Sequence, residues 1–248
     1  METSAVVVAV SNQKGGVGKT TSVVNLASFC ALGGRRVLVV DNDPQGNASS
    51  VFWPGSVDES IYSGGRPIPT RQEGVSVIPA GLDLADQETH LRQIDGGRMR
   101  LQGLLGKYRS DFDLIVIDCP PSVSSLSINA WMASDWVVVP LQCEYYALEG
   151  LSQLLQHLSD LEHTTGRAPA LAGILLTMHE ARFGLGHQVV AEVRAHFRER
   201  SFASVIPRDI ALAAAPSHGQ TILDYDPLSP GGLAYLAAAK EMLHVIER

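Results

Sequence analysis

The chain lacks long apolar runs, paired cysteines and clustered histidines. No apolar run reaches 18 residues, which excludes a membrane-spanning helix. The three cysteines, Cys30, Cys119 and Cys143, have no C-x-x-C spacing and are odd in number, which argues against a disulfide scaffold and a structural zinc site. None of the eight histidines is paired at i, i+4 as on a metal-binding helix. We expect buried apolar cysteines and assign no histidine a ligand role.

Positive charge is scarce as well. The net charge of -7 does not favour a constitutive nucleic-acid binder, although a local basic patch is compatible with it. No basic segment precedes the first apolar run, which enters a loop motif rather than a cleavage site, so we expect a cytoplasmic protein. No helix-turn-helix segment precedes this run, which argues against promoter-specific binding. With 248 residues, 45% of them hydrophobic, we expect one domain over residues 1–248.

Short apolar runs alternate with helical patterns along the chain. The segments 20–32 and 148–161 have helical spacing, and Gly33 and Gly34 stop the first of them. The stretch 53–74 is rich in proline and glycine, and we expect an exposed excursion there. The order predicts an α/β fold of the P-loop NTPase type, with a doubly wound, mostly parallel sheet and helices on both faces. The expected strands, apolar enough to be buried on both faces, are residues 5–10, 37–40, 114–117, 136–139 and 171–176.

The sequence NQKGGVGKTT at residues 12–21 is a variant phosphate-binding loop with one additional lysine, Lys14. Its glycines let backbone N–H groups turn toward one centre, and the helix that follows adds its positive end. Lys19 then supplies a charge for the β- and γ-phosphates, and the Thr20 hydroxyl is a ligand for Mg²⁺. We therefore expect a nucleotide site formed by Lys14, Gly15, Gly16, Val17, Gly18, Lys19, Thr20 and Thr21.

Carboxylates follow two of the expected strands. In VDNDPQ, the alternation of a strand turns Asp41 and Asp43 to one side and Asn42 to the other. In FDLIVIDCPP, an apolar strand ends in Asp118, the layout of a Walker B site. Aspartate after a strand is more often a turn former or a helix cap. Three carboxylates at the edge where α/β sheets bind ligands instead favour a magnesium site.

Five segments together resemble the ParA branch of the ParA/MinD ATPases. They are the phosphate-binding loop with its additional Lys14, VVDNDPQGNAS, FDLIVIDCPPS, PLQCEYYALEGLSQLL and VIPRDIALAAAPSHG. The resemblance spans nearly the whole chain, with the motifs in family order and at family spacing. It implies slow hydrolysis of ATP with Mg²⁺ in a homodimer that sandwiches two ATP molecules. Lys14 would reach the partner subunit's phosphates and Lys19 its own, as the catalytic lysines.

The same resemblance implies the remaining roles. Asp43 would position the attacking water and, with Thr20 and Asp118, lie at the metal. Met178, Pro207 and Arg208 would contact the nucleotide. Hydrolysis would be stimulated by a ParB-type centromere-binding protein. The ATP dimer would bind double-stranded DNA without sequence preference and associate with the nucleoid.

Basic residues carry DNA affinity in this family, and several are replaced here. Ala211, Leu228 and Pro230 stand where the family pattern would place arginines. Arg208 remains, and an ordinary solvated helix face is as compatible with the remaining arginines as a DNA patch is. The candidate DNA-binding residues are Arg182, Arg194, Arg198 and Arg200.

Three alternatives remain. A MinD-like membrane-positioning ATPase would need a basic amphipathic C-terminal helix, whereas residues 241–248 contain two acids and one arginine. A metabolic enzyme on the same loop, such as an iron–sulfur reductase or a synthetase, lacks suitable paired cysteines and an evident substrate pocket. A nucleotide-switched scaffold that positions a protein cargo would use DNA weakly or not at all.

Overall fold

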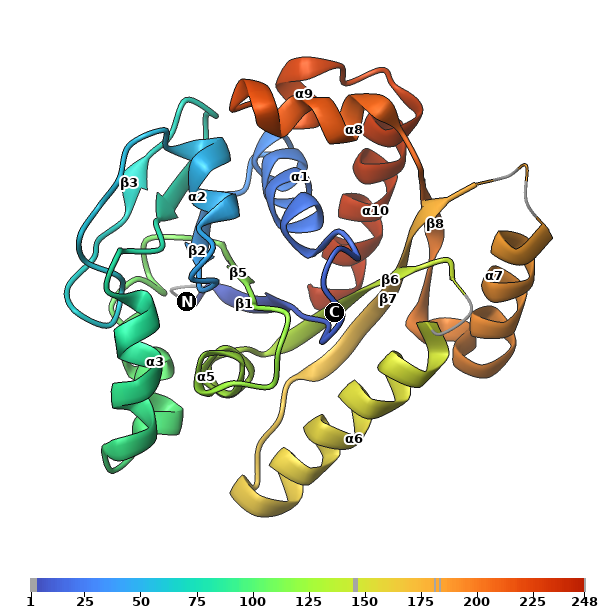
Figure 1. Cartoon of the computed structure of the whole chain (residues 1–248). Coiled ribbons are helices and arrows are strands. Elements are labelled where there is room, and N and C mark those ends of the chain that lie inside the picture. Colours follow the sequence, from blue (N-terminus) through green and yellow to red (C-terminus); the bar gives the residue numbers. More distant parts are fainter. Residues whose placement is uncertain (1–3, 145–146, 181, 183, 248) are drawn as a thin grey trace.

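One eight-stranded sheet organises the computed structural model, which describes residues 4–144, 147–180, 182 and 184–247 (Figure 1). The strand order is β3-β4-β2-β5-β1-β6-β7-β8. Every neighbouring pair is parallel except β3–β4. The strands are β1 Val6–Val10, β2 Val37–Asp41, β3 Ile68–Pro69, β4 Val75–Ile78, β5 Leu114–Asp118, β6 Trp136–Gln142, β7 Ala170–His179 and β8 Ser201–Pro207.

Helices cover both faces of the sheet (Figure 1). One buried apolar cluster joins the sheet to α1, α2, α8, α9 and α10, and a second joins it to α3, α4, α5, α6 and α7. The helices are α1 Lys19–Leu32, α2 Asn47–Phe52, α3 Leu84–Gln93, α4 Arg100–Leu105, α5 Ser125–Ala133, α6 Ala147–Thr165, α7 Gly184–Phe197, α8 Ile210–Ala214, α9 Ile222–Tyr225 and α10 Pro230–Ile246. Three short 3-10 helices are η1 Gly97–Met99, η2 Arg198–Arg200 and η3 Ala215–His218.

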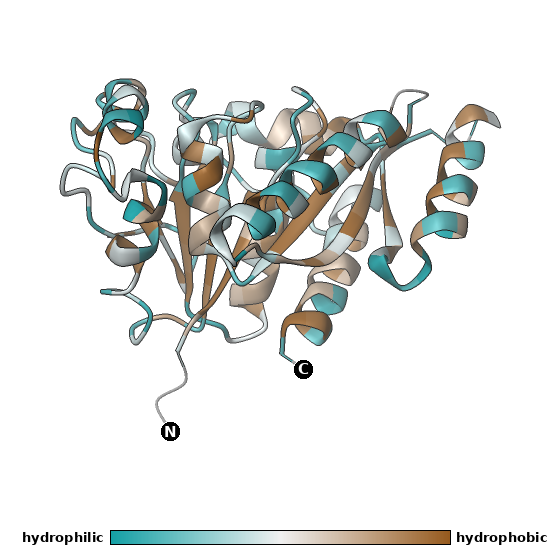
Figure 2. Ribbon diagram, turned by 90° about the horizontal axis from the view of Figure 1, so that it is seen from below, coloured by the Kyte–Doolittle hydropathy of each residue, from teal (hydrophilic) through white to brown (hydrophobic). Residues whose placement is uncertain are grey.

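The central strands are buried along almost their whole length, which explains their near-continuous runs of valine, leucine and isoleucine. Every residue of β2 and β5 is buried, because helices pack on both sides of them. Figure 2 shows the apolar strands enclosed by helices whose outer faces are more hydrophilic. The predicted doubly wound, mostly parallel sheet is confirmed. No helix within the described ranges is long and apolar enough to span a bilayer.

Two features of the chain differ from expectation. The stretch 53–74 is not wholly exposed: it contributes β3, and Ile61 and Tyr62 are buried, with the Tyr62 hydroxyl donating to Asn42 Oδ1. Strands β4 and β8 were not predicted, because their apolar runs are short and irregular. The five predicted strands all form, within one residue at their starts, and all three cysteines are free and buried as expected.

Candidate nucleotide-binding site

The register of the central strands brings the predicted motifs together. Val10 of β1 and Asp41 of β2 both pair with Asp118 of β5, so the three strands end side by side. The loop after β1 leads into α1, and the segment after β2 leads into α2. Because parallel strands share one carboxyl edge, the phosphate-binding loop and the aspartates meet there.

The loop is shaped by glycines and anchored by side chains. Gly16 and Gly18 have φ values of 76° and 87°, which favour glycine. Asn12 accepts a hydrogen bond from the Lys14 backbone N–H and donates to Pro140 O, and Thr177 donates to Val17 O. The N-cap residue of α1 is Gly18, which has no side chain to cap the first turn, and the N–H groups of a helix start are suited to bind an anion.

Lys19 lies inside this loop. Its side chain is buried, and Nζ donates to the Lys14 carbonyl at 3.1 Å. Burial lowers the pKa of Lys19, although Asp118 and Asp43 favour its charged form. A lysine held among backbone groups and two carboxylates is placed to exchange these partners for phosphate oxygens.

Thr20 and Asp118 form the candidate magnesium site. Thr20 Oγ1 donates to Asp118 Oδ2 at 2.7 Å, whereas the buried Asp118 Oδ1 has no hydrogen-bond partner within the described chain. Burial, followed by the nearby Asp41, raises the pKa of Asp118 well above its usual value. A divalent cation would satisfy the unpaired oxygen, so these residues fit Mg²⁺. No group of three or more His, Cys, Asp and Glu side chains suited to a metal occurs in the described residues.

The three polar residues at the end of β2, Asp41, Asn42 and Asp43, have different partners. Asp41 Oδ2 accepts from Ser49 N at 2.7 Å and from Ser49 Oγ at 2.6 Å, so this carboxylate holds the start of α2. Burial raises the pKa of Asp41 to about 6. Asn42 turns toward α5 and donates to Leu126 O. Asp43 accepts from Gln45 N at 3.0 Å and acts electrostatically on Lys19, which places it at the nucleotide side.

Lys14 has a separate partner. Its Nζ lies 2.7 Å from Glu144 Oε2, and Gln142 Nε2 donates to the other oxygen of Glu144. The Lys14 side chain is 44% exposed, so its amine lies at the surface beside the loop. Nothing in the sequence pattern indicated Glu144, because the two residues are 130 positions apart.

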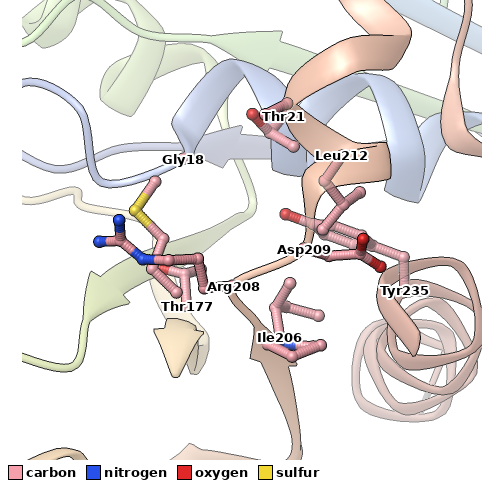
Figure 3. Close-up of a pocket in the computed structure, with 11 residues that line it drawn as sticks. Gly18, Thr21, Thr177, Ile206, Arg208, Asp209, Leu212 and Tyr235 are labelled. Carbon is pink, nitrogen blue, oxygen red and sulfur yellow. The ribbon is translucent and has the colours of Figure 1, made fainter. Parts of the chain in front are cut away.

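A cavity of about 200 Å³ lies beside the loop (Figure 3). It joins Gly18 and Thr21 of the loop to the predicted nucleotide contacts Met178, Pro207 and Arg208. The Arg208 guanidinium is partly engaged, since Nε lies 2.7 Å from Glu180 Oε1.

The walls of this cavity add side chains beyond the predicted nucleotide contacts. They are mostly apolar, as a flat aromatic base requires. Met178 has a φ of 53°, rare for a residue with a side chain, which supports a functional role for its position. The additional lining residues are Thr177, Ile206, Asp209, Leu212, Ala213 and Tyr235.

The four candidate DNA-binding arginines do not form one group. Arg194, Arg198 and Arg200 are exposed at the end of α7 and in η2, which precede β8 and lie toward the amino ends of the strands. Arg182 precedes α7 near the carboxyl end of β7. A helix of 14 residues, about 21 Å long, separates the two locations.

The chain is similar to known proteins over most of its length. A family model described as an AAA domain matches residues 5–169. The chain is 46% identical to the sporulation initiation inhibitor protein Soj of Bacillus subtilis, over 95% of this chain and 97% of that protein. It is 42% identical to the chromosome partitioning protein ParA of Myxococcus xanthus, over 96% and 87% of the two chains.

Solved structures show the same fold. A cobyrinic acid a,c-diamide synthase from Mycobacterium smegmatis with bound ADP and magnesium is 33% identical, with a TM-score of 0.81 and coverage of 97% and 94%. The cell division ATPase MinD of Pyrococcus furiosus is 23% identical, with a TM-score of 0.78 over 97% of this chain and 99% of that one. The second likeness concerns the fold alone.

Proposed function

Because the chain belongs to the ParA/Soj family of chromosome-partitioning ATPases, and is thus an ATPase that uses ATP and Mg²⁺, we propose that it segregates DNA through an ATP-controlled dimer. In the proposed cycle, ATP joins two subunits, the dimer binds DNA without sequence preference, and hydrolysis releases it. A ParB-type centromere-binding protein would stimulate the hydrolysis. Such a protein would associate with the nucleoid while bound to ATP.

Within one subunit, the loop and the aspartates divide the work. Backbone N–H groups of residues 15–20 and the Lys19 amine bind and orient the phosphates. Thr20 and Asp118 would hold Mg²⁺, which neutralises phosphate charge when bound. Asp43 orients the attacking water from the same edge of the sheet, a task that needs placement rather than strong basicity. Met178, Pro207 and Arg208 hold the base in the adjoining cavity.

The observation that carries the dimer is the position of Lys14. Its amine pairs with Glu144 at the surface, whereas the Lys19 amine is buried and donates to a carbonyl of the loop. An exposed ion pair of this kind contributes about 0–1 kcal/mol, so exchanging Glu144 for phosphate oxygens of a second subunit costs little. Lys14 would then act on the partner's nucleotide as an arginine finger does.

The DNA contacts are proposed for Arg182, Arg194, Arg198 and Arg200, all of which are exposed. A dimer doubles the number of these arginines that one DNA duplex can contact. The membrane alternative finds less support, because the apolar side of α10 is already buried: Tyr235, Ala238, Ala239 and Met242 pack on the sheet and α1.

The test is DNA retardation on fragments of unrelated sequence, with Mg²⁺ and either ATP or ADP. Wild-type protein with ATP should retard all fragments equally, and protein with ADP should not. Asp43→Ala should bind ATP, remain dimeric and hold DNA without turning ATP over. A dimer that retains no DNA at low salt would instead favour the nucleotide-switched scaffold for a protein cargo.

A further inference from the structure

A second cavity lies on the other side of the sheet from α1 and α10. It has a volume of about 540 Å³ and lies between the end of α3, η1, α5 and the turn after α6. In Figure 1, α5 lies between α3 and α6. No residue of this groove lines the nucleotide cavity, so the proposed ATPase cycle gives it no role. We refer to it as the α5 groove.

The α5 groove combines an apolar floor with a basic rim. Leu91, Ile94, Ile128 and Met132 supply apolar surface, and Met99 is 51% exposed beside them. The charged lining consists of three guanidinium groups and one carboxylate, in a chain whose net charge is -7. These groups are Arg92, Arg98, Arg167 and Asp95.

Two of the arginines have neighbours that fix their position without consuming all of their donors. Arg92 donates to Glu88 at 2.7 Å and to Ser125 Oγ at 3.1 Å, which holds its guanidinium at the first turn of α5. Arg167 lies 3.5 Å from Asp135, a long contact shared with Arg109. A guanidinium has five N–H donors, so both arginines retain donors for a further anion.

The turn that carries Arg98 and Met99 is rigidly built. The buried side chain of Asn129 donates to Gly97 O at 2.8 Å and accepts from Leu101 N at 3.0 Å. A Cβ on Gly97 would lie 2.0 Å from Leu91 O, so the turn packs directly against the end of α3. This anchoring fixes the backbone from which the exposed side chains of Arg98 and Met99 extend at the groove.

We propose that the α5 groove binds a small organic anion with an apolar body, such as an acyl or aryl carboxylate, sulfonate or phosphate. The volume is within the range of small-molecule sites, and the mixture of apolar surface with a few fixed polar groups is typical of them. The anionic group would lie between Arg98 and Arg167, where guanidinium groups make strong charge-assisted hydrogen bonds. The apolar body would cover Ile128 and the exposed Met99.

The experiment uses 8-anilinonaphthalene-1-sulfonate, an aryl sulfonate whose fluorescence rises in apolar sites. The full chain is titrated in saturating ADP and Mg²⁺, so that the nucleotide cavity is filled. One probe per chain is expected. The double variant Arg98→Gln/Arg167→Gln should weaken binding at least tenfold, whereas Arg66→Gln, an exposed arginine outside the groove, should change it less than twofold.

Competition identifies the ligand chemistry. Decanoate should displace the probe from wild-type protein, whereas decanol and inorganic phosphate at the same concentration should not. Equal displacement by decanol would show that the groove is only an apolar patch. Displacement by phosphate alone would show that it is a site for polar anions. Either result would overturn the proposal. Displacement only by an acidic peptide would assign the groove to a protein partner and overturn it too. The proposal is also overturned if the double variant binds the probe as tightly as wild type and has the same thermal unfolding temperature.

Discussion

At the scale of single residues, two lysines of one loop have different surroundings. Lys19 is buried, donates to the Lys14 carbonyl and is influenced by Asp118 and Asp43, whereas Lys14 lies at the surface on Glu144. Burial and pairing therefore distinguish residues that the sequence places five positions apart. The proposed roles in binding within the subunit and across a dimer follow from this difference.

Lys14→Ala should bind ATP as a monomer but fail to form the ATP dimer, because the removed charge acts on another subunit's phosphates. We expect nucleotide affinity within about threefold of wild type and a monomer in light scattering with ATP. Lys107→Ala removes an exposed lysine elsewhere and should dimerise normally. A Lys14→Ala dimer of wild-type stability would show that this lysine does not act across an interface.

The buried carboxyl group of Asp118 lowers the stability of the fold when it is charged and no cation is bound. Its raised pKa means that the folded chain holds the proton more tightly than the unfolded chain does. Above the folded pKa the buried charge destabilises the fold fully, and this cost fades as the pH falls toward the unfolded value of about 3.9. Asp118→Asn without nucleotide should therefore be more stable than wild type at pH 8, by about 1–3 kcal/mol, with a smaller difference at pH 5.

Urea unfolding at the two pH values measures this, and Asp113→Asn is the contrasting variant. Hydrogen bonds from Arg36 lower the pKa of Asp113, so its stabilisation is present at pH 8 and is lost as the pH falls through that lowered pKa. Asp113→Asn should consequently destabilise the protein at pH 8. Equal effects of the two substitutions would contradict the proposed origin of both pKa shifts.

At the scale of elements, buried polar side chains hold short turns and helix ends in place through hydrogen bonds. Asn129 of α5 fixes η1, Asn42 of the loop after β2 fixes α5 through Leu126 O, and Tyr62 fixes Asn42. Each bond joins segments distant in sequence and leaves no polar group of the pair unsatisfied. The order of α3, η1, α4 and α5 therefore depends on a few buried amides as well as on apolar packing.

Substitutions of two glycines, one in η1 and one in α4, distinguish the effect of close packing on stability from the effect of helix propensity. Gly97→Ala places a methyl group against the backbone of α3 and should destabilise the fold by roughly 2–4 kcal/mol. A methyl group on Gly103 of α4 would meet no atom within 4 Å, so Gly103→Ala should stabilise the fold by about 0.5–1 kcal/mol. Opposite shifts in the urea midpoint are expected, and shifts of the same sign would contradict the packing argument.

At the scale of the whole molecule, charge limits the proposed DNA binding. The chain is acidic, and its candidate arginines are divided between two ends of α7. The three positions where the family pattern would place arginines differ in their surroundings. Leu228 is 79% exposed, Ala211 packs partly against the core, and Pro230 is exposed but begins α10, where a proline suits the first helical position. Leu228 is thus the position best suited to carry an added charge.

Leu228→Arg should raise the DNA affinity of the ATP dimer and steepen its salt dependence, by up to about 0.9 log units for each new phosphate contact. Leu228→Gln removes the same apolar surface without adding charge and should leave the salt dependence unchanged. Basal ATP turnover should not change in either variant. Fluorescence anisotropy of labelled DNA across a salt series gives both slopes, and identical slopes would mean that this position does not face DNA.

The sequence by itself determined five strands of the sheet and the nucleotide loop. A strand buried on both faces must be apolar throughout, and a phosphate loop must contain glycines, a lysine and a hydroxyl at set positions. These requirements are local, so residues 6–10 and 12–21 revealed a strand, a loop and the start of a helix in order. The same reasoning identified Asp118 at the end of β5.

Only the tertiary structure decided what each polar group contacts. Asp41 holds Ser49 while Asp43 lies nearer Lys19, although strand alternation had turned both to the same side. The pairing of Lys14 with Glu144 and the place of Tyr235 in the nucleotide cavity join segments more than 100 residues apart. Such contacts depend on strand order and register, which a pattern of apolar residues does not specify, because any parallel neighbour satisfies a buried strand equally well.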